Sequence, residues 1–318
     1  MKIMNYTTMK ISFIILLLLF NNISLYDITL QDDAFHADLP LHIETWYFEA
    51  IFESNESMVF MITSLGSESK GILMIGVHFY ENGKIVYEKR VMYTSFYLSS
   101  ETPYIVAEGN EIMKGFLNEE GKICYNISYT TSSISFNLYF ENTTKGWKSN
   151  DGWLAIPNMR VEGNILINGK EKNVNGKGYH DHNIFFLLSP FVKRGYMDGK
   201  IMMSNFSVVW AKLMKNVFMQ EDFVIFSNSS YNLIENVSII CYDYEINHGK
   251  LIPTSFHISA ANENVVINIS LRAISVHFIR LPLLHYWRYH VHATGKIKME
   301  GGTIEVDTFD IMEYMLFT

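Results

Sequence analysis

The feature that most constrains the fold of this chain is a long series of short runs rich in Ile, Val, Tyr, Phe and Thr. These residue types favour β-strands, and clusters of Gly, Asn, Ser and Glu separate the runs. Two separators, Glu81 to Lys84 and Ile167 to Lys170, contain Asn-Gly, which accepts positive φ and marks a tight hairpin. No sustained 3.6-residue period lies between the runs, which argues against alternating strands and helices. We therefore expect an all-β protein of antiparallel barrels or sandwiches.

The predicted strands cover most of the chain. They are His42 to Glu53, Ser57 to Leu65, Gly71 to Tyr80, Lys84 to Leu98, Lys122 to Thr130, Ser132 to Glu141, Lys200 to Lys212, Asp222 to Phe226, Val237 to Ile246, Leu251 to Ser259, Val265 to Ala273, Tyr286 to Lys298 and Thr303 to Asp310.

Composition limits the class of protein. With 318 residues, 48% hydrophobic and 18% charged, the chain is globular and long enough for two domains. Its formal net charge is -8, and no basic stripe could neutralise a phosphate backbone. Nucleic acid is therefore not an expected partner.

The N-terminal segment, residues 1–30, predicts export. Lys2 and Lys10 precede an apolar run from Ile11 to Phe20 that is short for a bilayer span and is typical of a signal-peptide core. Asn22-Ile23-Ser24 is a poor cleavage site, so a retained membrane anchor is the alternative. Either way we expect the rest of the chain outside the cytoplasm, secreted or anchored to the membrane.

Glycosylation sequons support this expectation. They lie at Asn5, Asn22, Asn55, Asn126, Asn142, Asn205, Asn228, Asn236 and Asn268. The number of sequons exceeds what chance would give and favours a glycan-bearing surface, although an Asn-rich and Ser-rich strand protein can also generate sequons by composition alone. Cys124 and Cys241 lie far apart and are expected to be two buried free thiols.

The segment Gly176 to Asn183, with the sequence Gly-Lys-Gly-Tyr-His-Asp-His-Asn, concentrates polar and titratable side chains beside two glycines. If the segment is extended, Tyr179, Asp181 and Asn183 point to one face of the strand, and His180 and His182 to the other. One face then carries a carboxylate with two hydrogen-bonding neighbours, and the other an imidazole pair.

Together with His42 to Glu49, His-Ile-Glu-Thr-Trp-Tyr-Phe-Glu, this segment resembles the two signatures of the hydroxyneurosporene synthase family. That family includes the carotenoid 1,2-hydratases and AttH-like proteins and is related to tocopherol cyclases and fungal Diels-Alder cyclases. The resemblance implies two tandem antiparallel lipocalin-like (calycin) β-barrels, over residues 31–190 and 191–318. Thr45 stands where the family commonly has tryptophan, and Ile184-Phe185 where Trp-Gly is usual.

The resemblance also implies a hydrophobic small-molecule ligand, an isoprenoid or another lipid, and no cofactor. We expect an exported lipocalin-like binding protein; the alternative is a hydratase or cyclase that protonates an alkene from a buried acid. Asp181 is the candidate acid, with Tyr179 and His182 setting its hydrogen bonds and Glu44 as a second carboxylate. The residues expected to contact the ligand are Trp46 and Phe48, as an aromatic wall, with His180 and Asn183.

Other interpretations of these motifs stay open. The polar segment could form a buried hydrogen-bond network that joins the two barrels, and the aromatic motif could simply fill a core. A metal site is a third hypothesis, since His180 and His182 share their spacing with His290 and His292. The tract His285 to His290 could line a cavity mouth or contact a membrane surface, although alternating strand packing is the ordinary explanation.

Overall fold

The computed structural model of the chain describes residues 23–186, 194–215, 220–281 and 284–317. Most of the predicted export segment, the sequons at Asn5 and Asn22, and the predicted boundary at residue 190 lie outside the described residues. The described chain is almost entirely strand and forms two antiparallel sheets, which confirms the predicted fold class. No helix in these four stretches has the length and apolarity to cross a membrane.

The first sheet has 13 strands in the order β5-β4-β3-β2-β13-β12-β10-β9-β8-β7-β6, with β1 and β11 attached beside β12. A short 3-10 helix, η1 (Leu30–Asp33), precedes β2. The strands are β1 (Leu25–Tyr26), β2 (His42–Phe52), β3 (Glu56–Gly66), β4 (Gly71–Glu81), β5 (Lys84–Tyr93), β6 (Phe96–Leu98), β7 (Tyr104–Ala107), β8 (Asn110–Leu117), β9 (Ile123–Thr130), β10 (Ile134–Asn142), β11 (Trp147–Ser149), β12 (Trp153–Ile167) and β13 (Lys170–Phe186).

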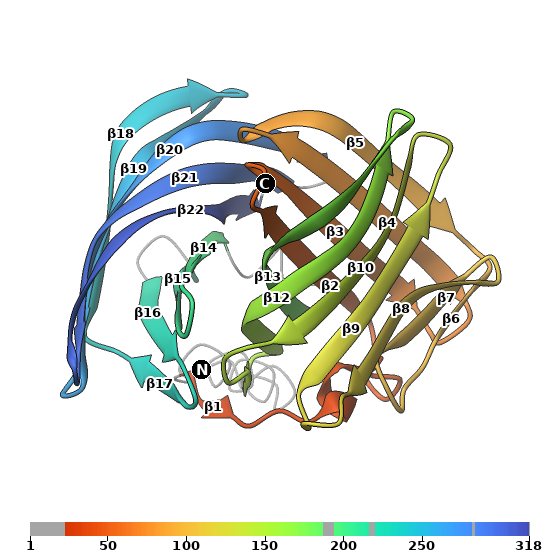
Figure 1. Cartoon of the computed structure of the whole chain (residues 1–318), viewed down its shortest axis with the longest axis horizontal. Coiled ribbons are helices and arrows are strands. Elements are labelled where there is room, and N and C mark those ends of the chain that lie inside the picture. The colour runs from red at the N-terminus through yellow and green to blue at the C-terminus, as the bar shows by residue number, and fades with distance from the viewer. Residues whose placement is uncertain (1–22, 187–193, 216–219, 282–283, 318) are drawn as a thin grey trace, which may run out of the picture.

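The second sheet has nine strands in the order β17-β16-β15-β14-β22-β21-β20-β19-β18. They are β14 (Gly195–Met202), β15 (Ser207–Met214), β16 (Gln220–Ser227), β17 (Tyr231–Ile234), β18 (Val237–Asn247), β19 (Lys250–Ala261), β20 (Val265–Leu281), β21 (Leu284–Met299) and β22 (Gly302–Phe317). Figure 1 shows the first sheet curled into a nearly closed barrel, on the right, and the second curved into a half-barrel on the left.

Both sheets repeat one topology. In each, the first long strand pairs with the last, β2 with β13 and β14 with β22. Each sheet also has its two free edges at strands that are consecutive in the chain. These edge strands are β5 and β6 in the first sheet and β17 and β18 in the second. This arrangement brings residues near position 45 beside residues near position 182.

The predicted hairpins form as expected. Asn82 and Gly83 have φ of 49° and 75°, and Asn168 and Gly169 have φ of 51° and 75°. Positive φ at both central residues is the geometry of a type I′ turn, which matches the twist of paired strands. No predicted strand covered β7, β8, β12 or β13. Polar residues in β8, β12 and β13 hide the pattern, and β7 is only four residues long.

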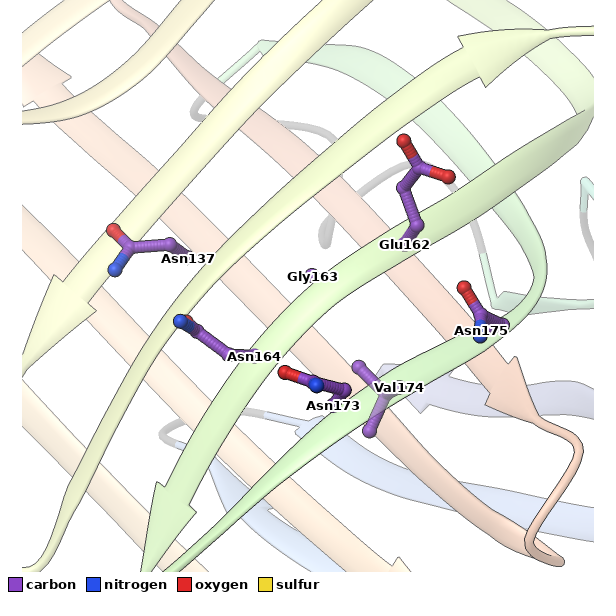
Figure 2. Close-up of a pocket in the computed structure, with 7 residues that line it drawn as sticks. All are labelled: Asn137, Glu162, Gly163, Asn164, Asn173, Val174 and Asn175. Carbon is purple, nitrogen blue, oxygen red and sulfur yellow. The ribbon is translucent and has the colours of Figure 1, made fainter.

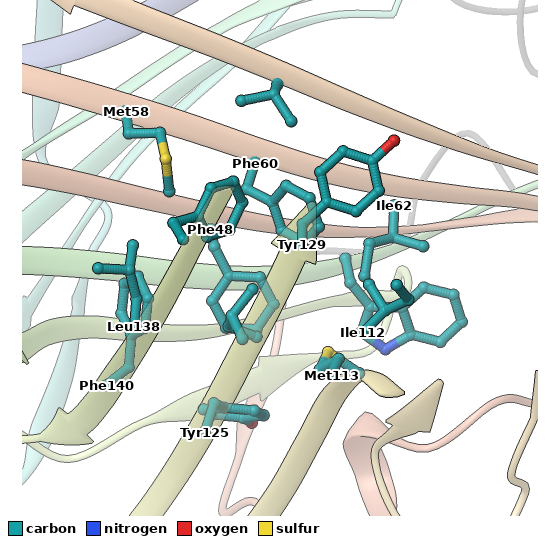
Figure 3. Close-up of a cluster of buried hydrophobic side chains, with 14 of the residues drawn as sticks. Phe48, Met58, Phe60, Ile62, Ile112, Met113, Tyr125, Tyr129, Leu138 and Phe140 are labelled. Atoms are coloured by element: carbon teal, nitrogen blue, oxygen red, sulfur yellow. The ribbon is translucent and has the colours of Figure 1, made fainter. Parts of the chain in front are cut away.

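Alternation along the strands produces three packed regions. One fills the first barrel, where the Phe48 ring meets Tyr125 and Phe140 edge to face at centroid distances of 5.2 and 5.3 Å. Figure 3 shows part of this cluster. A second lines the concave side of the half-barrel and contains Trp210 and Trp287. The third lies between the sheets and draws Tyr47 and Tyr179 from the first sheet and Phe223 and Ile311 from the second.

The seven described sequon asparagines are all at least partly accessible. Asn55, Asn126, Asn205, Asn236 and Asn268 are exposed, whereas Asn142 and Asn228 are half-buried. Both cysteines are free, as expected, but only Cys124 is buried, and Cys241 keeps partial exposure because β18 is an edge strand. Glycosylation and export stay predictions.

Candidate functional site

The two sequence motifs face each other across the β2/β13 pair. His182 is opposite Trp46, His180 opposite Phe48, and Asp181 opposite Tyr47. Paired residues of neighbouring strands point to the same side of a sheet. His180 and His182 therefore face the interior of the first barrel, while Tyr179, Asp181 and Asn183 face the second sheet, as alternation predicts.

Inside the first barrel, His182 bridges two buried carboxylates. Its Nε2 lies 2.8 Å from Glu44 Oε2, and its Nδ1 lies 3.1 Å from Asp33 Oδ1. Burial lowers the pKa of the imidazole, but Asp33 and Glu44 outweigh burial and raise the pKa of His182 to about 9. Burial opposes ionisation of Glu44, yet His182 and His36 hold its pKa down to about 2. The three groups form a charged, hydrogen-bonded unit.

This unit holds the segment around η1 against the barrel. Tyr125 donates a 2.8 Å hydrogen bond to Asp33 Oδ2, His180 Nε2 lies 3.1 Å from the same oxygen, and the Trp46 indole N–H donates to the Asp33 carbonyl at 2.9 Å. The Trp46 ring also stacks on His182 at a centroid distance of 4.4 Å. Asp33 was not singled out from the sequence, because nothing in the short polar segment Gln31 to Asp33 indicates that one of its carboxylates is buried.

Three donor atoms in this region, from His36, Glu44 and His182, lie within 4.8 Å of one another, a separation that could accommodate a metal ion. The Glu44 carboxylate already pairs with both imidazoles, so a proton on His182 supplies the positive charge that a metal would bring. The four-histidine site is wrong: His290 pairs with Ser57 at 2.8 Å, and His292 with the exposed Asp307 at 2.6 Å. They lie on the second sheet, away from the barrel interior.

Between the two sheets, Asp181 is 6% exposed and accepts two hydrogen bonds. The Tyr179 hydroxyl donates to Oδ2 at 2.9 Å, and the Asn183 amide to Oδ1 at 2.7 Å. Burial raises the pKa of Asp181 to about 7; the Tyr179 hydrogen bond offsets part of this effect, and the negative Glu313 adds to it. Asp181 is thus a carboxyl group that can hold a proton near neutral pH.

Two buried cations lie on the facing surface of the second sheet. Lys200 is bonded to Glu49, which also accepts the Tyr47 hydroxyl at 2.9 Å. Arg288 is 0% exposed, and its Nε donates to Glu313 at 2.9 Å. Each cation is therefore matched by a carboxylate other than Asp181.

Two of the carboxyl groups that face this interface, Asp181 and Asp198, have no ion pair with a cation among the described residues. Burial raises the pKa of Asp198 well above its usual range, and Glu313 and Asp181 raise it further. For both groups burial is the main reason that the pKa is raised, and negative neighbours add to it. The polar interface also joins the barrels, through contacts that include Lys177 to Asp310 at 2.9 Å.

The structure separates the predicted site residues into two groups. Glu44, Trp46, Phe48, His180 and His182 lie inside the first barrel, whereas Tyr179, Asp181 and Asn183 lie between the sheets. His182 therefore does not set the hydrogen bonds of Asp181, and Glu44 cannot act beside it, because neighbouring residues of one strand point to opposite faces. Trp46 and Phe48 likewise form no wall for Asp181.

Little in the sequence pointed to the two cations. Lys200 and Arg288 lie in strands that also contain other polar residues, such as Asp198 in β14 and His290 in β21, so the residue pattern does not single them out. In the tract His285 to His290, Trp287 and Tyr289 fill the core of the second sheet, and Tyr286 and Arg288 face the first sheet. This is the alternating packing that we gave as the ordinary explanation.

Two surface hollows stand out, and neither contains a predicted site residue. One, of about 470 Å³, is lined by side chains of β10, β12 and β13 that are mostly asparagine (Figure 2). The other, of about 400 Å³, lies where β5 meets β20 and includes Glu88, Arg90 and Arg280. Both linings carry amide or charged side chains, which an apolar ligand would leave without hydrogen bonds.

The fold defines the class of protein as tandem lipocalin-like, the class that the sequence motifs predict. No family model and no curated protein matches the sequence. Solved structures do: an AttH-like protein of Nitrosomonas europaea has a TM-score of 0.59 at 11% identity, covering 92% of this chain and 98% of its own. CghA with Sch210972 has a TM-score of 0.60 at 9% identity, covering 93% and 98%. Kievitone hydratase from Nectria haematococca has a TM-score of 0.57 at 10% identity, covering 87% and 89%.

Proposed function

We propose that this protein is an enzyme that protonates an alkene and thereby hydrates or cyclises an isoprenoid or polyene substrate, with Asp181 as the acid. The observation that carries the proposal is the environment of the Asp181 carboxyl group. It is a buried carboxyl with two neutral donors, Tyr179 and Asn183, and both cations of the interface are matched by other carboxylates. Because its pKa is about 7, such a carboxyl is protonated in part of the molecules at neutral pH and can transfer that proton to an acceptor.

The proposed step balances as follows. The Asp181 carboxyl transfers its proton to one alkene carbon, and the positive charge develops on the other. In hydration, a water oxygen bonds to that carbon and its proton returns to the Asp181 carboxylate; in cyclisation, a second double bond attacks and a neighbouring C–H proton returns instead. Tyr179, whose hydroxyl bonds the carboxyl, is a positioning residue.

An aromatic face near the developing charge would stabilise it. Trp46 and Phe48 cannot supply that face, but Trp153 can, because it pairs with Asn183 in the β12/β13 register and so shares the side of Asp181. The Tyr179 ring is less available, since Lys200 Nζ lies 4.5 Å from its centroid. Trp153 therefore replaces the predicted aromatic wall.

The comparisons support this proposal only through fold. One structural neighbour is named a hydratase, and another was solved with the small molecule Sch210972. A fold hosts many functions, so the argument rests on the site and not on these names.

Ligand binding without chemistry is the second candidate. Both oxygens of Asp181 accept hydrogen bonds, which suits a structural role in a binding protein. The packed interior of the first barrel speaks against a carrier of the usual lipocalin kind, since Phe48, Tyr125 and Phe140 occupy the space where such a ligand would lie. Any ligand would have to bind between the sheets.

Turnover by Asp181→Asn tests the proposal. The purified protein is incubated with farnesol in deuterated water, and deuterium on carbon is measured by mass spectrometry. We expect label in the wild-type product, a rate that falls as pH rises above about 7, and loss of label in the variant with an unchanged urea midpoint. Asp307→Asn, an exposed matched control, should label normally. An Asp181→Asn protein that labels farnesol as fast as wild type would refute the role of Asp181.

A further inference from the structure

Asp198 extends the site onto the second sheet. Tyr196, Asp198 and Lys200 alternate along β14 and share one face. Lys200 on that face reaches the first sheet, where it bonds to Glu49 and lies above the Tyr179 ring. Asp198 lies two residues before Lys200 in β14, and its charge acts on both Asp181 and Tyr179. The carboxyl of Asp198 thus lies in the same region as that of Asp181.

Unlike Asp181, Asp198 lacks hydrogen-bond donors. Its Oδ1 is buried and has no hydrogen-bond partner among the described residues, and no cation pairs with it there. A buried polar atom that is left unpaired destabilises the fold, so the Asp198 Oδ1 atom calls for a partner.

Asp198 and Tyr196 keep partial solvent exposure although they lie between the sheets. Burial nevertheless raises the pKa of Asp198 and of Tyr196 well above their usual ranges. Both side chains are thus strongly desolvated but still have part of their surface open, where a small molecule can contact them. The raised pKa favours the protonated form of each group, which can donate a hydrogen bond.

We propose that the substrate of this site carries a hydrogen-bond-accepting oxygen, a hydroxyl or carbonyl, and that Asp198 and Tyr196 bind it while Asp181 faces the alkene. The inference rests on the proposed function for the role of Asp181. An oxygenated isoprenoid can accept hydrogen bonds from both groups. A hydrocarbon polyene displaces the water that solvates them and offers no hydrogen-bond acceptor in its place. A site built to bond a substrate oxygen rejects the analogue that lacks it.

Farnesol and farnesene test the inference, because they share a carbon skeleton and differ in one hydroxyl group. Their binding to the full chain is measured by equilibrium dialysis. We expect wild type to bind farnesol at least tenfold more tightly than farnesene, as loss of one or two hydrogen bonds of about 1–1.5 kcal/mol implies. Asp198→Leu should remove most of that preference, Asp198→Asn should keep most of it, and Asp307→Leu should leave it unchanged.

Tyr196→Phe provides a second variant should Asp198→Leu fail to fold. It should weaken the binding of farnesol and leave the binding of farnesene unchanged. Equal binding of the two probes by wild type, binding of neither, or a preference that survives both Asp198→Leu and Tyr196→Phe would overturn the inference. Asp181→Asn separates this result from the proposed function: it should keep the farnesol preference while losing deuterium transfer. A labelled farnesene product would leave Asp181 as the acid and refute only the oxygen requirement.

Discussion

Arg288 offers the sharpest test of how the two sheets are held together. Its side chain is fully buried, and it donates hydrogen bonds to Glu313 and Tyr286 at 2.9 Å, to Tyr80 at 3.1 Å and to His78 Nδ1 at 2.6 Å. Arg288→Met keeps the apolar stem but leaves the Glu313 carboxylate buried without a cation. Breaking a buried pair in this way costs about 3–5 kcal/mol.

The measurement is the urea midpoint of unfolding, followed by tryptophan fluorescence. With a slope of about 2 kcal/mol per molar urea, a loss of 4 kcal/mol lowers the midpoint by about 2 M. The double variant Arg288→Met with Glu313→Gln removes the uncompensated charge, so it should be more stable than Arg288→Met alone. Arg272→Met, at an exposed position on β20, should change the midpoint little.

Two outcomes would refute this reasoning. A loss below about 1 kcal/mol for Arg288→Met would mean that solvent reaches Glu313 and screens it as at a surface. A double variant as unstable as the sum of the two single variants would mean that Arg288 acts through packing and not through its pair with Glu313.

Two further predictions concern the first barrel. The pKa of His182 in the folded protein, about 9, lies above the ordinary 6.5, so the stability that its charge contributes is complete below pH 6.5 and is lost as the pH rises toward 9. The urea midpoint of the wild-type protein should therefore fall between pH 6.5 and 9, and His182→Gln should reduce that fall. An equally steep fall in the variant would contradict the pairing of His182 with Asp33 and Glu44. Gly178→Ala should lower stability by about 1–3 kcal/mol, because a Cβ there would lie 2.4 Å from Val161 Cγ2, and an unchanged midpoint would show that the barrel core yields.

Much of the fold and part of the site could be predicted because they depend on local patterns. Asn82-Gly83 and Asn168-Gly169 specify hairpins through their own φ, and alternation alone places His182 and Asp181 on opposite faces. Glu44 is paired with Ile184, whose side chain points to the face opposite to that of Asp181. Side-chain alternation therefore also excludes Glu44 as a second carboxylate beside Asp181. That register is a long-range property, and no local residue pattern reveals it.

The partners of Asp181 illustrate the limit most clearly. Tyr179 and Asn183 are its sequence neighbours, and their hydrogen bonds to it follow from an extended strand. Asp198, Lys200 and Arg288 come from strands of another sheet, and their arrangement depends on which faces of the two sheets meet. Burial between the two sheets raises the pKa of Asp181, and the charges of Glu313 and Lys200 act on it from the second sheet, so the chemistry of the residue could not be read from its own segment.

The amino-acid sequence by itself determined the all-β class, the hairpin positions and the two-faced character of the strand that carries Asp181, because backbone preference and side-chain alternation act over a few residues. The tertiary structure decided that the first barrel is packed, that His182 bonds to Asp33 and Glu44, and that Asp181 lies against the second sheet. These outcomes depend on burial and on charges brought together from distant strands, and only the folded chain brings them into contact.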